Sequence, residues 1–161
     1  MTPDDLLAEL AIRRTINFYN VSGDRGRTGD MSQAFTEDAV LVTPYGTMEG
    51  RAQIAGGLSG GKTRGWTASF VRHNLTTSRI ELTGPDTATG RNYFIVITDI
   101  GLDRTGVYHD RYRKVGGHWL IEHREVRLDY VADDTMLAPK EDAMIRGVRG
   151  GPGTPPVGGN R

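Results

Sequence analysis

The apolar residues near the N-terminus recur with the period of a helix. From Leu6 to Tyr19 they cluster on one side of a helix turning about 100° per residue, which predicts a helix over residues 3–20. Thr2 is placed to cap it, and Pro3 suits its first position. The face expected to be buried carries Leu7, Ala8, Ala11, Ile12, Thr15, Ile16, Phe18 and Tyr19. The opposite face carries Glu9, Arg13, Asn17 and Asn20.

After residue 65 the apolar period changes to the alternation of strands. Strands are predicted over 66–75, 77–83, 87–99, 105–115 and 118–130, with turns at Gly84–Asp86 and Gly116–Gly117. Before them, short helices are expected at 31–35 and 51–58, and a strand at 39–43. Helices followed by a run of antiparallel strands indicate the α+β class, with the helices packed on one face of a curved sheet.

The 161 residues correspond to about one domain. Residues 146–161 are rich in Gly and Pro and lack an apolar period, which predicts a flexible tail after a single domain over residues 1–145. Twenty basic residues balance twenty acidic ones, so neither nucleic acid nor an anionic membrane is an expected partner. There is no cysteine and no signal-peptide pattern, and a cytoplasmic location is expected.

Residues 56–63, GGLSGGKT, match the phosphate-binding loop pattern letter for letter. That loop works only where a buried strand delivers it and a helix follows, so that the helix N-terminus faces the phosphates. Here a polar, helix-like segment precedes the glycines and a strand is predicted after them. We therefore do not expect nucleotide binding.

His73 is the histidine that most strongly suggests chemistry. It alternates with Val71 and Leu75 along a predicted strand, which turns its side chain inward. Asp24 follows the first helix between glycines and is its natural partner. A core histidine and an ordinary turn aspartate fit the same residues. The other histidines show no metal-ligand spacing, so no metal site is expected.

Polar residues also lie on the apolar faces of two later strands. Asn92 and Phe94 share one face of the middle strand, and Tyr108 and Asp110 share one face of the next. A polar group on such a face needs a hydrogen-bond partner or lines a pocket. Both interpretations stay open at this point.

Segments along the chain, taken in order, resemble the SnoaL-like branch of the NTF2-like superfamily. They read LAELAIRRTINFY, GDRG, AFTEDAVLVTPYG, EGRAQI, FVRHNLTTSRIEL, TATGRNYFIVI and GVYHDRYRKVGGHWLIEHREVRLDY, and together they span residues 5–131. The resemblance implies a cone, in which three N-terminal helices pack into a strongly curved antiparallel sheet around a pocket. It also implies a homodimer or homotrimer that buries the outer face of the sheet.

Dehydratase-like members of this superfamily pair an Asp after the first helix with a His on the first long strand. These positions match Asp24 and His73, and a tyrosine of the bile-acid dehydratase matches Tyr19. The titratable residue of the middle strand falls at Asn92, which cannot titrate, and a substrate-contacting tyrosine falls near Tyr108. The resemblance thus implies His73, Asp24 and Tyr19 as catalytic residues. The substrate-binding residues expected are Tyr108, Asn92, Asp110, Phe94 and Tyr45.

The implied activity is that of a cofactor-free lyase or isomerase of the dehydratase type. Its substrate is expected to be a small hydrophobic ring compound derived from a steroid, a polyketide or an aromatic. A histidine oriented by a carboxylate is a base tuned near neutral pH, which suits removal of a C–H proton. Two alternatives share the fold: a non-catalytic ligand-binding module, and the small structural subunit of a ring-hydroxylating dioxygenase.

Overall fold

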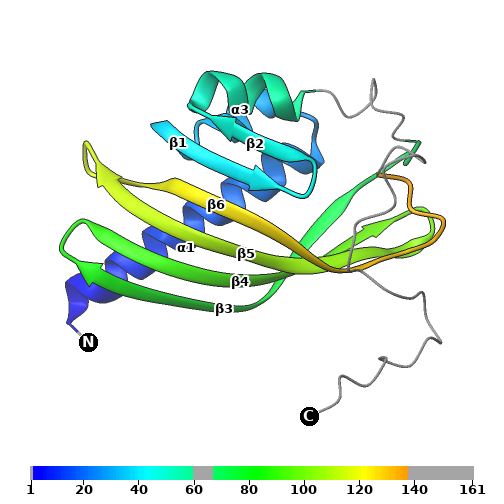
Figure 1. Ribbon diagram of the computed structural model, residues 1–161. Helices are drawn as coiled ribbons and strands as arrows, with labels where there is room; N and C mark the ends of the chain where they lie inside the picture. Colours follow the sequence, from blue (N-terminus) through cyan, green and yellow to red (C-terminus); the bar gives the residue numbers. More distant parts are fainter. Residues whose placement is uncertain (1, 60–66, 138–161) are drawn as a thin grey trace, which may run out of the picture.

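The computed structural model describes residues 2–59 and 67–137 (Figure 1). Figure 1 shows the first helix crossing one face of a curved sheet, with the third helix beyond the two short strands at one edge. Along the chain the elements are α1 (Pro3–Asp24), α2 (Thr28–Ser32), β1 (Phe35–Thr43), β2 (Gly46–Glu49), α3 (Arg51–Leu58), β3 (Arg72–Gly84), β4 (Thr87–Thr98), β5 (Gly101–Val115) and β6 (His118–Val131).

The described strands form one six-stranded sheet in the order β2-β1-β6-β5-β4-β3. The predicted α+β class and the curved sheet covered by the N-terminal helix are confirmed. The pairing differs from the prediction at one place, because β1 runs parallel to β6. Parallel neighbours need a long connection, and here the whole chain from β2 to β5 provides it. The other pairings are antiparallel.

Helix α1 begins as the sequence predicts. The Thr2 hydroxyl accepts a bond from the Asp5 backbone N–H, and the Asp5 carboxylate accepts one from Thr2 in return. The prediction of its buried face was partly wrong, because Leu7 and Phe18 are exposed whereas Asn20 is buried. The sheet covers a narrower stripe than the apolar residues span. Asn20 is tolerated inside because it accepts a bond from the Tyr108 hydroxyl at 3.3 Å.

Several element boundaries also differ from the prediction. The strands predicted at 66–75 and 77–83 form one strand, β3, in which the register shifts between Leu75 and Ser78. The helix expected at 31–35 ends at Ser32, and β1 begins at Phe35, which pairs with Ile121 and is fully buried. Burial of this large side chain in the sheet outweighs a weak local preference for helix. The segment 51–58 is helical, as predicted.

The glycine-rich motif starts inside α3, where Gly56 and Gly57 are helical. The motif's last four residues, 60–63, which include Lys62, lie outside the described residues, as does the predicted tail at 146–161. A helix that precedes the motif is the reverse of what a phosphate-binding loop needs. None of the described helices is both long and apolar enough to span a membrane.

Gly106 on β5 makes room for the aromatic residues of the inner face. A Cβ at this position would collide with the Arg127 carbonyl and lie 2.7 Å from the ring of Phe94. Its absence lets Phe94 stack on Tyr108, with ring centroids 4.5 Å apart. The packing of Phe94 on Tyr108 therefore requires a glycine at position 106.

Candidate functional site

The end of α1 and the start of β3 bring Asp24 and His73 together. Nδ1 of His73 lies 2.6 Å from Oδ1 of Asp24. The backbone N–H of His73 also donates to both carboxylate oxygens, at 3.2 and 3.0 Å. The side chains are only 10% (Asp24) and 25% (His73) exposed. One carboxylate therefore holds both the backbone and the ring of His73.

This contact defines how the imidazole can act. A carboxylate at Nδ1 favours the tautomer with its proton on that nitrogen, which leaves the lone pair on Nε2. The same carboxylate stabilises the imidazolium once Nε2 has taken a proton. The pair thus has the arrangement of a general base and the group that orients it.

A row of neighbouring aromatic rings continues from His73 along the inner face. The centroid of Phe94 lies 6.3 Å from that of His73, and Phe94 stacks on Tyr108 at an interplanar angle of 24°. Tyr19, from α1, meets Tyr108 edge to face at 6.1 Å. The structure thus brings Phe94, Tyr108 and Tyr19 onto the side of the sheet that carries the Asp24–His73 pair.

Arg124, on β6, is a buried cation beside these rings that the sequence analysis missed. Its guanidinium lies 4.3 Å from the centroid of Tyr19 and 4.0 Å from that of Tyr108. It binds both oxygens of Asp110 at 2.8 Å, and both side chains are fully buried. Burial opposes the charge on Arg124, but the adjacent Asp110 outweighs it and raises the guanidinium pKa. Arg124 lies in the largely polar segment IEHREVR, so the sequence pattern does not indicate that its side chain faces inward.

Asn92 and Asp110 belong to the same buried network. The Asn92 side-chain amide donates to Asp110 at 2.9 Å and to the Tyr112 hydroxyl at 3.0 Å. The Tyr112 hydroxyl in turn donates to Asp110 at 2.6 Å. Asp110 is therefore fully engaged by side chains of the protein itself. Its predicted role in substrate binding, and that of Asn92, stay predictions, because the contacts of both describe a structural network.

The buried tyrosines keep their protons over a wide pH range. Burial raises the pKa of the Tyr108 hydroxyl well above its usual value, and Arg124 only partly opposes this. Burial likewise raises the pKa of Tyr19. Both hydroxyls are therefore hydrogen-bond donors at neutral pH, and neither acts as a base there.

Tyr45 lies apart from this row, in the turn between β1 and β2. It is 44% exposed, and its hydroxyl accepts a bond from Arg104 at 3.4 Å. Arg104 also donates to Asp103 and Thr135. Because Val96 pairs with both His73 and Arg104, these two residues lie on the same face of the sheet, two strands apart. Tyr45 thus belongs to a second polar cluster, which also contains Arg104, Asp103 and Thr135.

Asp103 anchors the segment after β6 to this cluster. Its carboxylate accepts bonds from the Thr135 hydroxyl at 2.6 Å and the Met136 backbone N–H at 2.9 Å. Burial raises the pKa of Asp103, but these bonds and Arg104 outweigh it and hold the pKa below the usual value. Among residues 2–59 and 67–137, no group of three or more acidic or histidine side chains is arranged to hold a metal ion.

A family described as a SnoaL-like domain matches residues 4–125. No curated protein matches the chain. Solved structures do match it closely in fold. An NTF2-like protein with a cystatin-like fold from Novosphingobium aromaticivorans is 26% identical, with a TM-score of 0.66, over 79% of this chain and 90% of the other.

Two further solved structures carry names of enzymes. A putative scytalone dehydratase from Novosphingobium aromaticivorans is 24% identical, with a TM-score of 0.69, over 80% of this chain and 88% of the other. Hexachlorocyclohexane dehydrochlorinase LinA-type3 from Novosphingobium barchaimii is 20% identical, with a TM-score of 0.70, over 80% and 91%. At these identities the likeness establishes a shared fold.

Proposed function

This chain belongs to the SnoaL-like family, and we propose that it is a cofactor-free lyase of the dehydratase type, acting on a small hydrophobic ring compound. His73 is the general base and Asp24 orients it. The observation that carries the proposal is the 2.6 Å contact between Nδ1 of His73 and Oδ1 of Asp24. Among the described residues Nε2 of His73 has no hydrogen bond, and the ring lies on a side of the sheet lined by aromatic rings.

The proposed reaction is an elimination. Nε2 of His73 removes a proton from carbon, the C–H electron pair forms a C=C bond, and the bond to the leaving group breaks on the neighbouring carbon. A leaving hydroxide takes up the proton from the His73 imidazolium and departs as water, whereas a leaving chloride departs as the anion and the imidazolium returns its proton to solvent. Asp24 stabilises the imidazolium formed at His73. In this proposal Tyr19 donates a hydrogen bond to the leaving group, while Tyr108, Phe94 and Tyr45 contact the substrate.

The names of two structural neighbours support elimination over isomerisation. A dehydratase removes water and a dehydrochlorinase removes hydrogen chloride, so both names describe the loss of a small molecule from a carbon framework. The buried rings of Phe94, Tyr108 and Tyr19 supply the apolar surface that a hydrophobic ring compound requires.

The purified protein is expected to eliminate a small molecule from at least one of a panel of ring compounds. The panel contains scytalone, hexachlorocyclohexane and cyclic β-hydroxy ketones. Loss of water is followed by mass spectrometry and loss of chloride by ion chromatography, and a metal chelator is expected to leave the rate unchanged. Saturable binding of these compounds without turnover would favour the ligand-binding module. Co-purification with a larger iron-containing subunit would favour the dioxygenase subunit.

We also propose that the chain forms a homodimer or homotrimer. Large apolar side chains are exposed along α1, where Leu6, Leu7, Leu10 and Val21 are each more than half exposed. The family resemblance places the interface on the outer face of the sheet. Burial of this stripe of α1 against another copy would also remove apolar surface from water, which favours association. Light scattering is expected to give the mass of two or three chains of 17.7 kDa. The mass of one chain at every concentration would contradict the proposal.

A further inference from the structure

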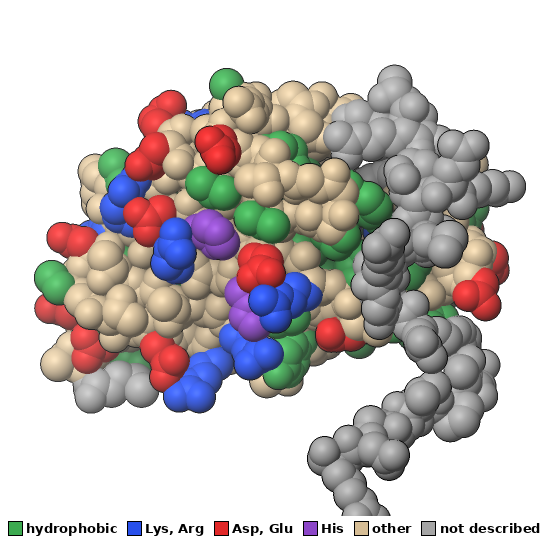
Figure 2. Space-filling view, in the orientation of Figure 1, with side chains coloured by type: hydrophobic (Ala, Val, Ile, Leu, Met, Phe, Trp, Pro, Cys, Tyr) green, Lys and Arg blue, Asp and Glu red, His purple; other side chains and the backbone are tan. Residues whose placement is uncertain are grey.

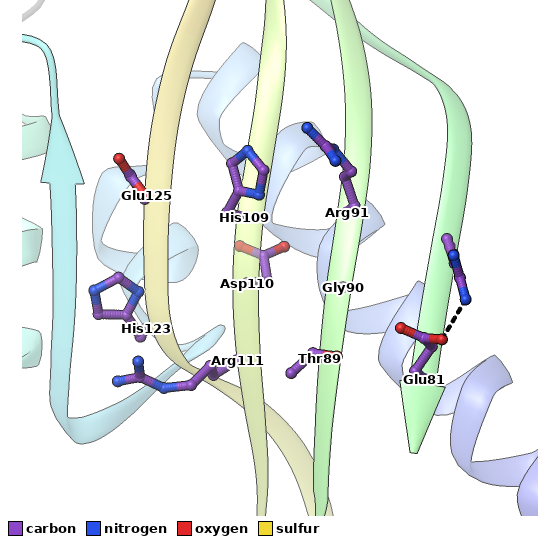
Figure 3. A pocket seen from close by; sticks show the side chains of 10 residues that line it. Glu81, Thr89, Gly90, Arg91, His109, Asp110, Arg111, His123 and Glu125 are labelled. Carbon is purple, nitrogen blue, oxygen red and sulfur yellow. Dashed lines mark hydrogen bonds and ion pairs between the residues drawn. The ribbon is translucent and has the colours of Figure 1, made fainter. Parts of the chain in front are cut away.

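The outer face of the sheet carries a polar groove of about 440 Å³. Figure 2 shows histidine, arginine and acidic side chains gathered over this face, and Figure 3 shows that Arg91 and Arg111 point away from each other. Arg111 extends toward Glu122, and the Arg91 guanidinium lies 6.0 Å from the ring centroid of Tyr93. The charged side chains of this groove therefore share no centre at which a ligand would bind.

On the inner face, a segment that follows the sheet turns back across one end of it. Residues 132–137, called the strap below, follow β6 and return toward the start of β3 (Figure 1). The Met136 carbonyl accepts a bond from the Thr67 backbone N–H at 3.1 Å. Thr67 lies just before β3, the strand that carries His73. The strap therefore connects the end of β6 with the end of the sheet where His73 lies.

The Asp103 carboxylate is shared between the sheet and the strap. From the sheet it accepts bonds from the Thr98 hydroxyl and from Nε of Arg104, both at 3.1 Å. From the strap it accepts bonds from the Thr135 hydroxyl at 2.6 Å and the Met136 backbone N–H at 2.9 Å. Asp103 is completely buried. One carboxylate thus fixes the strap to the sheet through hydrogen bonds to a charged group, which are stronger than those between neutral groups.

Leu137 is the apolar anchor of the strap. Its side chain is 3% exposed and belongs to the same buried cluster as Phe94 and Val96. Val96 lies directly opposite His73 in the register of β3 and β4. Leu137 is therefore part of the apolar surface at the end of the inner face nearest His73.

The strap can leave this position without unpairing any of the described strands. Between β6 and its two anchors it has only a turn, in which Asp133 and Asp134 are exposed. After it leaves, Asp103 keeps its bonds from Arg104 and Thr98, so no buried charge is left without a partner. Segments held by few buried contacts open locally at a lower free energy than the sheet that holds them.

We propose that the strap is a movable wall of the inner-face site, in which Leu137 limits the size of the ring compound admitted and Asp103 is the positioning residue that holds the wall closed. With the wall closed, Leu137 occupies space beside the apolar cluster and small rings are accepted. With the wall open, that space is available to larger fused rings. Loss of a bond that holds the strap raises the population of the open state. The site is the one of the proposed function, but opening of the wall is measurable without turnover.

Hydrogen exchange of the full chain tests the opening. Thr135→Val removes the strap hydroxyl from Asp103 and keeps the Asp103–Arg104 pair. The Met136 amide is expected to exchange at least about tenfold faster, as for the loss of one hydrogen bond to a charged group. Thr98→Val is the matched control, because it removes a hydroxyl from the same carboxylate but from β4, and it should change this rate less than about threefold. Thr135→Ser keeps the hydroxyl and should keep exchange slow, and amides of β4 and β5 should exchange unchanged in all three variants.

Leu137→Ala tests the size limit, with cyclohexanone as a one-ring probe and testosterone as a probe of four fused rings. Binding is followed by NMR shifts of the His73 ring protons. The variant is expected to bind testosterone at least about tenfold more tightly than the unmodified chain does, with cyclohexanone nearly unchanged, because a leucine side chain is removed from the wall. Leu102→Ala is the matched control, because Leu102 is exposed on β5, and it should leave both affinities unchanged.

The outcomes separate this proposal from the proposed reaction. Faster strap exchange together with a gain for testosterone supports the wall, even where no compound of the panel is eliminated, a result that contradicts only the proposed reaction. Equal exchange of the strap in Thr135→Val and Thr98→Val overturns the strap as a separate opening unit. An unchanged preference between the two probes in Leu137→Ala, or no shift of His73 with either probe in any variant, overturns the size limit.

Discussion

Replacing His73 with alanine is expected to lower turnover by about 10⁴-fold, because the change removes the base that accepts the carbon-bound proton. The fold should survive, since the backbone N–H of residue 73, which bonds Asp24, is retained. Turnover is measured with whichever compound of the panel is eliminated, and folding by circular dichroism. His118→Ala is the matched control, because that histidine is exposed at a hairpin turn. Undiminished turnover in the His73 variant would overturn the assigned base.

The Asp24→Asn variant separates orientation from proton transfer. Asparagine keeps an oxygen for the His73 backbone N–H, but it neither stabilises the imidazolium nor secures the tautomer. Turnover is expected to fall by about 10²–10⁴-fold, while binding of the same compound changes far less. An equal loss of binding and turnover would mean that Asp24 holds the substrate or the fold, and would contradict its role as orienting residue.

Arg124→Met is expected to destabilise the protein by about 3–5 kcal/mol, the largest stability effect that we predict for a single substitution. The change leaves the carboxylate of Asp110, which is fully buried, without its bidentate partner. The free energy of unfolding is measured by urea denaturation. Arg113→Met is the control, because Arg113 pairs with Asp38 and Glu122 at the surface and should change stability by less than about 1 kcal/mol.

A second substitution tests the cause of this loss. Adding Asp110→Leu to Arg124→Met removes the uncompensated charge, so part of the lost stability should return. If the Arg124→Met variant unfolded with the same free energy as the Arg113→Met control, the prediction that the buried Arg124–Asp110 pair stabilises the fold would be wrong.

Local patterns in the chain were sufficient to predict much of the fold. The Thr2 cap and the helical period place α1, because both depend on residues close together in sequence. Gly116 and Gly117 predict a two-residue hairpin, and both have positive φ where β5 turns into β6. Strand alternation also puts Phe94 and Tyr108 on the inner face, where both are buried.

Other features depend on contacts between distant parts of the chain. Asp24 and His73 are far apart in sequence, and only the packing of α1 against β3 brings them within 2.6 Å. The glycines around Asp24 and the strand position of His73 make the two residues candidate partners, and the family resemblance implies the pair, but no local pattern fixes the contact itself. The face of α1 was misjudged at Leu7, Phe18 and Asn20, because the width of the sheet decides which stripe of an apolar helix is covered.

The burial of Arg124 is the feature of the site that the sequence alone predicts least. Its polar sequence neighbours predict that the Arg124 side chain is exposed, because burial of a lone charge is costly. Its burial becomes favourable only when Asp110 from the neighbouring strand and the rings of Tyr19 and Tyr108 surround it together. Local propensity and period thus define helices, strands and their inward faces. The partners that make a buried charge or a catalytic contact possible come from different elements, and they meet only when the sheet curves around α1.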